Sequence, residues 1–375
     1  MNDPHLEARH RDLAARARSF GEKQLRAAGR DEEDPGARAR EIAGRLGEEG
    51  LLRAVVPPPF GEMDSRSVAV ARETLAYFSL LAESVLAAQG LAAQAVAGAG
   101  NEVQKDRWLP VLVSGEILGA FALAEPESGS DLASVRTVAE AEGALWRLSG
   151  IKTWVTNAGV AGLYAVLARN PESQGSRGLS LFLVDGEAPN LAVRPIEAMA
   201  ALPVGELELD GVPGVRLGDE GAGRRLARQV LEALRPGAAG AACGLAARAL
   251  DETLRHVLAR RQFGRPLADF QSVRLELAAM HANLEAARRL ARHAAWLADV
   301  GAEEAPRAAT AARLFAAEMA GRVVDRAVQL HGAQGLVRGS TVERLFREAR
   351  ALRIREGTTE LLGLELGQDL VKESR

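Results

Sequence analysis

The middle of the chain contains the stretch WRLSGIKTWVT, residues 146–156, which is rich in β-branched and aromatic residues. Further short runs of strand character occupy residues 163–167, 179–184 and 206–209. Glycine, proline, asparagine and aspartate punctuate these runs, as turns between strands require. The pattern predicts a small antiparallel β domain in the middle of the chain.

Helical spacing governs the sequence on both sides of this β domain. Before it, apolar residues in 68–82 trace one helical face, and Arg72 and Glu73 fall off that face. After it, apolar stripes recur along residues 250–330, and long amphipathic helices joined by Gly and Pro turns predict a bundle. The expected fold is mainly α with a central β domain: an N-terminal helical domain (1–117), a middle β domain (118–220) and a C-terminal helical bundle (221–375).

The composition narrows the kind of protein and its partners. Hydrophobic residues make up 47% of the 375 residues, and the net charge of −3 calls for neither nucleic acid nor an anionic membrane. The single cysteine, Cys243, excludes an internal disulfide, and its alanine-rich surroundings favour a buried small hydrophobe. Residues 1–12 offer no apolar core for a signal peptide, and no uninterrupted apolar stretch reaches the ~20 residues of a membrane span. We therefore expect a cytoplasmic protein.

The usual short signatures of cofactor and metal sites are absent from the sequence. It has no G-x-G-x-x-G, no P-loop, no H-E-x-x-H and no paired C-x-x-C motif. Six histidines and one cysteine argue against a dense metal cluster, so we expect no metal site. Redox chemistry would need a cofactor that is bound without a Rossmann fingerprint.

Four segments, in the same order along the chain, resemble the motifs of the acyl-CoA dehydrogenase family. They are FALAEPESGSD at 121–131, GIKTWVTN at 150–157, RRQFGRPL at 260–267 followed by Phe270-Gln271, and a last group formed by QLHG at 329–332, VERLFR at 342–347 and EGTTE at 356–360. The resemblance covers nearly the whole chain. It implies the acyl-CoA dehydrogenase-like fold, with a middle β-barrel domain and a C-terminal four-helix bundle.

The same resemblance implies that the protein binds FAD. Trp154 would lie against the flavin and the Thr156 hydroxyl would meet its N5 edge, since residues two apart face the same side of a strand. Arg260 would reach the FAD pyrophosphate of a neighbouring subunit, because the guanidinium fork matches phosphate oxygens. Gln329 and Gly332 would form a second contact across subunits.

The resemblance also implies the reaction, the α,β-dehydrogenation of an acyl-CoA to a trans-2-enoyl-CoA. Glu356 would abstract the α-proton and flavin N5 would accept the β-hydride. The backbone N–H of Glu356 and a ribityl hydroxyl of FAD would stabilise the enolate oxygen, and an apolar pocket is expected to raise the pKa of Glu356. The remaining implied contacts are Glu125, Gln262, Phe263, Thr358 and Glu360 for FAD, and Ser130, Glu232 and Arg235 for the thioester.

The choice of Glu356 as the base rests on a comparison within the family. Some members carry the base on the helix that begins the C-terminal domain, and here that position is Leu234. Glu232 would point roughly 200° away from Leu234 on a helix, so it is a poor substitute. The resemblance further implies an electron-transferring flavoprotein as the electron acceptor and a homotetramer, built as a dimer of dimers.

Each motif also has an interpretation that needs no ligand. An isolated Trp154 would favour core packing. Arg260 and Arg261 would occupy the last turn of a helix, where the helix dipole favours cations. Residues 128–131 would form a turn with a helix cap, and residues 356–358 an ordinary loop. Two functional alternatives stay open: an oxidase or acyl-carrier-protein dehydrogenase on the same fold, and a non-catalytic helical scaffold.

The sequence departs from the family pattern at Ala124, Ala333, Leu336 and Arg355. The last departure stands directly before the expected base. Arg355 either favours an acyl chain with an acidic or polar group, or it only lowers the pKa of Glu356, since an opposite charge favours the carboxylate.

Overall fold

The computed structural model describes residues 3–25, 33–143, 145–171 and 178–373. The expected domain limits at residues 1 and 375 lie outside these residues, and the expected division into three domains remains a prediction. The chain forms two compact units. The helical unit comprises Met1–Gly29, Ser65–Glu83 and Arg235–Arg375, and the β unit comprises Arg30–Asp64 and Ser84–Leu234.

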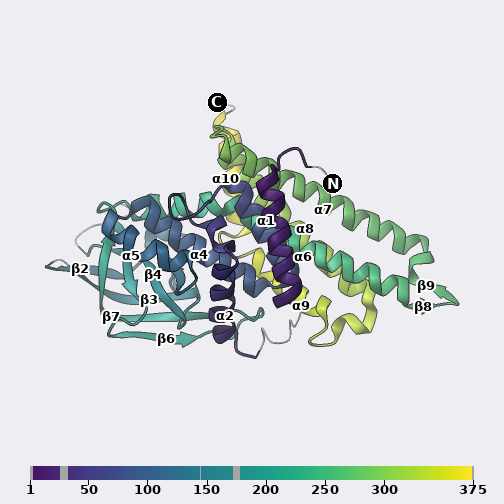
Figure 1. Ribbon diagram of the computed structural model, residues 1–375, viewed down its shortest axis with the longest axis horizontal. Coiled ribbons are helices and arrows are strands. Elements are labelled where there is room, and N and C mark those ends of the chain that lie inside the picture. Colours follow the sequence, from purple (N-terminus) through teal and green to yellow (C-terminus); the bar gives the residue numbers. More distant parts are fainter. Residues whose placement is uncertain (1–2, 26–32, 144, 172–177, 374–375) are drawn as a thin grey trace. The chain divides into compact units, whose positions relative to one another are not determined.

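Seven strands form one sheet in the β unit (Figure 1). They are β1 (Leu118–Ala122), β2 (Val138–Glu142), β3 (Leu145–Thr156), β4 (Ala161–Arg169), β5 (Leu179–Asp185), β6 (Leu191–Pro195) and β7 (Val204–Leu217). The order β1-β4-β2-β3-β7-β5 closes into a ring because β4 also pairs with β5, and β6 lies beside β7. The expected barrel is confirmed. The expectation of a purely antiparallel domain is wrong, because β1 and β2 both pair with β4 in parallel.

A continuous hydrophobic core fills the β unit. Its helical elements are α2 (Pro35–Glu48), η2 (Leu51–Val55), α5 (Glu102–Val113), η3 (Leu132–Ser134) and parts of α4 (Leu80–Ala99) and α6 (Gly223–Ala259). Side chains of α4 and α5 pack there against β4, β5 and the first turns of α6. Within the described residues, α4 is the one helix long and apolar enough to cross a membrane, and 83% of its apolar window is buried inside the protein.

The helical unit is a bundle, as the apolar stripes predicted. Its elements are α1 (Ala8–Gln24), α3 (Ser65–Phe78), the rest of α6, the hairpin β8 (Arg261–Gln262) and β9 (Arg265–Pro266), η5 (Leu267–Asp269), α7 (Gln271–Asp299), α8 (Ala305–His331), η6 (Gly332–Leu336), α9 (Thr341–Leu352) and α10 (Thr359–Glu373). Cys243 of α6 is fully buried, as expected, and burial raises the pKa of its thiol.

Helices α3 and α6 approach each other closely because glycines line the contact. A Cβ on Gly240 would lie 2.4 Å from the carbonyl oxygen of Ala69, and one on Gly244 would lie 2.1 Å from that of Glu73. A Cβ on Gly237 would lie 2.7 Å from Cδ of Arg72. Each distance is shorter than a van der Waals contact, so only glycine allows this separation. Because of these glycines, the side chain of Arg72 packs directly against α6.

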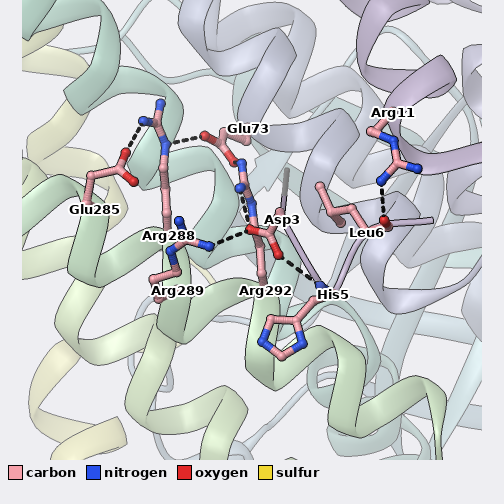
Figure 2. A network of polar contacts seen from close by, with 9 residues as sticks. All are labelled: Asp3, His5, Leu6, Arg11, Glu73, Glu285, Arg288, Arg289 and Arg292. Atoms are coloured by element: carbon pink, nitrogen blue, oxygen red, sulfur yellow. Dashed lines mark hydrogen bonds and ion pairs between the residues drawn. The ribbon is translucent and has the colours of Figure 1, made fainter. Parts of the chain in front are cut away.

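Ion pairs hold α3 and the N-terminal segment against α7 (Figure 2). Asp3 is buried and accepts hydrogen bonds from Arg289 and Arg292 of α7, at 3.2 and 2.7 Å. Glu73 of α3 accepts from Arg288 at 2.7 Å and from Arg292 at 3.4 Å. Because Glu73 directly follows Arg72 in the chain, this network fixes the helix that carries Arg72.

Candidate active site

Glu356 lies between α9 and α10 in a strained backbone conformation. Its φ is 56°, in the left-handed region that a residue with a Cβ rarely adopts, and the following Gly357 has a φ of 104°. Such a conformation costs on the order of 1–3 kcal/mol and persists only where the surroundings impose it. The side chain of Glu356 is 13% exposed. The strain is consistent with a functional position.

A buried arginine of α3 holds the carboxylate of Glu356. Nη1 of Arg72 donates to Oε2 at 3.1 Å, and Nη2 donates to Oε1 at 2.8 Å. The same Nη2 lies 2.6 Å from Oε1 of Glu83, at the first turn of α4. The side chains of Arg72 and Glu83 are both buried completely or nearly so. This paired contact fixes the position and the rotation of the carboxylate, because two parallel N–H···O bonds define a plane.

Two further arginines complete the ion cluster of Arg72, Glu83, Arg313, Arg355 and Glu356. Nη2 of Arg355 lies 3.3 Å from Glu83 and 3.4 Å from Glu356. Arg313 of α8 is fully buried, and its Nη2 donates to the carbonyl oxygens of Leu352 and Arg355. This contact ties the loop before Glu356 to the bundle. Within the described residues, Nε and Nη1 of Arg313 have no hydrogen-bond partner.

The electrostatics of Glu356 differ from the expectation of an apolar pocket. Burial acts to raise the pKa of Glu356, but the charge and hydrogen bonds of Arg72, together with Arg355 and Arg313, outweigh it and lower the pKa to about 2. The prediction of a raised pKa is therefore wrong for the ligand-free protein. With three arginines and two glutamates, the ion cluster carries a net charge of +1. Burial lowers the pKa of Arg313 to about 10, so it is still charged at neutral pH.

The sequence reasoning missed Arg72, Glu83 and Arg313. Helical spacing placed Arg72 off the apolar face of α3, yet Arg72 is fully buried because α3 is covered on several sides. The signal that could have found it is the series Gly237, Gly240 and Gly244 on α6, whose spacing of three and four residues predicts a close helix contact.

The hairpin after α6 presents several predicted cofactor residues to the exterior of the helical unit. Both arginines were expected in the last turn of α6, but Arg260 follows the end of the helix and Arg261 belongs to β8, so that prediction is wrong. Arg260, Gln262 and Phe263 are all exposed, and Phe263 is 92% exposed with a φ of 51°. Within the described residues, the guanidinium of Arg260 makes no hydrogen bond. A large exposed aromatic beside an unpaired cation is a surface that suits an anionic, ring-bearing ligand.

The end of α8 lies beside this hairpin. The rings of His256 and His331 stack with their centroids 4.2 Å apart, which joins the last turns of α6 and α8. Gln329 is exposed there, and Gly332 has a φ of 58° with open space around its Cα. The structure thus brings together the two segments, around Arg260 and Gln329, that the resemblance assigns to one FAD.

In the β unit, Trp154 stands out from β3. It is 62% exposed and has a φ of 55°, and the register of β3 shifts between Lys152 and Val155. The simple alternation expected for Trp154 and Thr156 is therefore interrupted, although both side chains stay accessible. Core packing of Trp154 is excluded within the β unit, and an exposed indole beside a hydroxyl suits a flat ring system.

Glu125 and Ser130 lie on the loop after β1 and differ in accessibility. Glu125 is buried, and its Oε1 lies 2.8 Å from Nζ of Lys152 and also accepts from Thr137. Burial acts to raise its pKa, but the charge and hydrogen bond of Lys152, together with the hydrogen bonds from Thr137 and Arg136, lower it. Both oxygens of Glu125 accept hydrogen bonds that anchor the loop to β3, and its role in binding FAD stays a prediction. Ser130 is exposed, and Asp131 caps η3 as the turn interpretation predicted.

The remaining predicted residues have internal partners. Glu232 is partly exposed and pairs with Arg228 at 2.6 Å, one helical turn away. Arg235 is buried and donates to Thr310 at 2.6 Å and to Glu365 at 3.1 Å, and its contact with the substrate stays a prediction. Thr358 and Glu360 lie at the start of α10. The hydroxyl of Thr358 accepts from the backbone of Leu361, and Glu360 is exposed.

Comparison with known proteins covers the whole chain. The acyl-CoA dehydrogenase N-terminal, middle and C-terminal domain models match residues 7–116, 120–212 and 221–370. The chain is 34% identical over 367 residues to the cyclohexane-1-carbonyl-CoA dehydrogenase of Geobacter metallireducens, covering 93% of this chain and 96% of that protein.

Two solved structures extend this comparison. The butyryl-CoA dehydrogenase from Megasphaera elsdenii has a TM-score of 0.92 and 31% identity, covering 99% of this chain and 100% of that one. The glutaryl-CoA dehydrogenase from Mycobacterium smegmatis has a TM-score of 0.89 and 32% identity, covering 97% and 95%. The names of these relatives give three different acyl groups, so the comparisons alone do not select one.

Proposed function

Because the chain belongs to the acyl-CoA dehydrogenase family and is an FAD-dependent acyl-CoA dehydrogenase, we propose that Glu356 is the base that removes the α-proton of the thioester. The observation that carries the proposal is the conformation of Glu356. A carboxylate held in a left-handed backbone, ionised, and directed by a buried arginine has the attributes of a positioned base.

The work of the protein's own residues is to place and then release this carboxylate. The pairing with Arg72 keeps Glu356 ionised, as a base must be before it takes a proton. The same pairing makes Glu356 a weak base, since a pKa of about 2 lies far below the range useful at neutral pH. The carboxylate must therefore separate from Arg72 when the substrate binds, and its pKa then rises as burial acts with less opposition. The positive charge of the ion cluster favours the developing enolate.

Separate residues of the two units fit the cofactor. In the β unit, Trp154 offers an exposed ring and Thr156 a hydroxyl. In the helical unit, Arg260 and Phe263 offer a free guanidinium and an exposed ring, and Gly332 leaves room for close backbone approach. When bound, FAD supplies the acceptor for the hydride that leaves Cβ.

The test of this function is the anaerobic bleaching of the flavin by acyl thioesters. The purified holoprotein should be yellow, and at least one acyl-CoA should bleach the flavin absorbance in a single turnover. Glu356→Gln should keep the colour and bind the same thioester but lose the bleaching. A yellow protein that no acyl-CoA or acyl-carrier thioester bleaches would contradict the proposal.

We also propose the partners that the family implies. The electron acceptor is an electron-transferring flavoprotein, the assembly is a dimer of dimers, and the location is the cytoplasm. The exposed Arg260, Phe263 and Gln329 support the assembly, because their side chains have no polar partner among the described residues of the helical unit and suit an FAD held across subunits. Light scattering of an active, FAD-replete monomer would contradict the assembly. Rapid reoxidation of the reduced enzyme by oxygen would replace the flavoprotein acceptor with an oxidase reaction.

A further inference from the structure

We propose that the acyl group of the substrate carries a second carboxylate, and that this carboxylate takes the place of Glu356 on Arg72 and Arg355. This inference rests on the proposed function, because it assumes that Glu356 leaves Arg72 to act as the base. It names the substrate class as short monothioesters of dicarboxylic acids. The ion cluster of Arg72, Glu83, Arg313, Arg355 and Glu356 carries the argument.

The first step is the charge of the ion cluster. Its three arginines and two glutamates sum to +1, and Arg72, Glu83 and Arg313 are almost completely buried. An unbalanced buried charge is costly, because little water reaches it to solvate it. A second carboxylate on the substrate would bring the cluster to neutrality. A plain acyl chain would leave the excess charge in place and cover it with hydrocarbon.

Arg72 loses two hydrogen-bond acceptors when Glu356 moves away. Arg72 has a side-chain exposure of only 1%, and two of its N–H groups donate to Glu356. Arg72 would keep its contact with Glu83, but the N–H groups that donate to Glu356 would lose this acceptor, and a buried charged donor without its acceptor is costly. A carboxylate from the acyl chain has the same geometry as the departing one and would accept the same two hydrogen bonds. The substrate carboxylate would then free Glu356 to act as the base and would restore the hydrogen bonds that Arg72 loses.

The side chains of the ion cluster differ in their exposure to solvent. Arg355 and Glu356 are the most exposed members of the ion cluster, at 19% and 13% of the side chain, and Arg72 lies behind them. A ligand that displaces Glu356 therefore meets Arg355 first and Arg72 next. Arg313 is fully buried, and its Nε and Nη1 lack hydrogen-bond partners in the described part of the chain.

The position of the base limits the length of the acyl chain. The α-carbon must lie about 3–3.5 Å from an oxygen of Glu356 for proton transfer. Arg72 lies 2.8–3.1 Å beyond these oxygens. A carboxylate oxygen that reaches Arg72 must therefore stand about 3–5 Å from the α-carbon, and an extended chain advances about 1.2 Å per bond. Acyl groups of about four or five carbons meet this condition.

A basic acyl group is the competing substrate class. It would require Glu83 as its partner, but Glu83 is fully buried and already contacts Arg72 and Arg355. A third cation would also raise the net charge of the ion cluster further. The observations therefore favour a carboxylate, and an ω-amino thioester serves as an arm of the test.

The experiment compares thioesters of equal length on the holoenzyme by anaerobic flavin bleaching. The probes are glutaryl-CoA, its ω-methyl ester, pentanoyl-CoA and 5-aminopentanoyl-CoA. We expect kcat/KM for glutaryl-CoA to exceed the values for pentanoyl-CoA and the ester by at least about 10²-fold, because a site built for polar groups rejects analogues that lack them. Succinyl-CoA and butanoyl-CoA form a second pair that tests chain length.

Each outcome decides between the proposals. If kcat/KM for pentanoyl-CoA or the methyl ester equals or exceeds kcat/KM for glutaryl-CoA, the inference is overturned and the proposed function stays intact. Bleaching by 5-aminopentanoyl-CoA alone would show that the site takes a cationic acyl group, and it would overturn the inference. Failure of every thioester in this panel would overturn the inference, and the proposed function would fall only if longer and branched acyl thioesters failed as well. Arg355→Gln, at the more exposed edge, should reduce the preference for glutaryl-CoA over pentanoyl-CoA at least tenfold without loss of FAD, and an unchanged preference would also overturn the inference.

Discussion

Replacing Arg72 with methionine would show whether this arginine sets the basicity of Glu356. The surroundings lower the pKa of Glu356 from 4.5 to about 2, which corresponds to roughly 3 kcal/mol of differential interaction. Burial opposes this shift, and among the groups that lower the pKa, Arg72 acts most strongly. Without Arg72, burial and the negative charge of Glu83 both raise the pKa. We expect it to increase by at least about two units, to 4 or above.

The pH dependence of kcat/KM measures this change. Glu356 must be ionised to accept the proton, so activity falls tenfold per pH unit below the pKa of the free enzyme. In the parent protein, the acid limb due to Glu356 should lie near pH 2, and the profile should be flat on the acid side from pH 7 to about 4.5. In Arg72→Met, a limb should enter the measurable range between about pH 4 and 6. The position of the limb is independent of any general loss of activity.

Two further variants serve as controls for the effect of Arg72→Met. Arg248 is also a partly buried arginine of the helical unit, and it pairs with Glu252, so Arg248→Met should leave the limb in place. If Arg72→Met does not fold, the double change Arg72→Met with Glu83→Gln also removes the buried negative charge that faced Arg72 and should restore folding. Superimposable acid limbs in the parent and in a folded, yellow Arg72 variant would refute the reasoning.

Three further predictions concern the base, the cofactor and the helix contact. Glu356→Gln should lower turnover by about 10²–10⁴-fold with FAD retained, as measured by single-turnover bleaching, whereas Glu232→Gln should change it little because that side chain pairs within its own helix. Arg260→Ala should weaken FAD retention on dilution, and Arg261→Ala, whose guanidinium donates to the hairpin backbone, should not. Gly237→Ala should lower the free energy of unfolding by about 1–3 kcal/mol in urea titrations, because the added methyl would lie 2.6 Å from a valine of α3; an unchanged value would contradict the close contact.

The strands that sequence reasoning found share a composition that the missed strands lack. β3, β4, β5 and β7 contain β-branched or aromatic residues, or long apolar runs, and turn residues mark their ends. β1, β2 and β6 are five residues each and contain Ala, Gly, Glu or Pro, which have low strand propensity. Their pairing depends on neighbours distant in sequence, such as the parallel contact of β1 with β4. Local propensity carries no information about such a contact.

Some features of the candidate site follow from local sequence, and others depend on residues that are distant in the chain. Glu356 was identified from its motif, and its strained backbone agrees with a functional role. The prediction of a raised pKa failed because two of the groups that lower it, Arg72 of α3 and Arg313 of α8, come from distant parts of the chain, and only Arg355 is a neighbour in sequence. Periodicity assigns an arginine off the apolar face to solvent, which holds for a helix covered on one side only. Arg72 lies on a helix covered on several sides, so periodicity gave the wrong environment.

Stability alone does not account for the ion cluster. A buried ion pair loses much of its attraction to desolvation, and apolar residues of similar volume often stabilise a protein as well or better. An unbalanced cluster is worse still, because one charge remains without compensation. The five charged residues of the ion cluster, Glu356 among them, therefore reduce stability relative to an apolar core. Their arrangement makes sense if the missing negative charge arrives with the substrate, and the cost in the ligand-free protein then becomes a source of specificity for the acyl group.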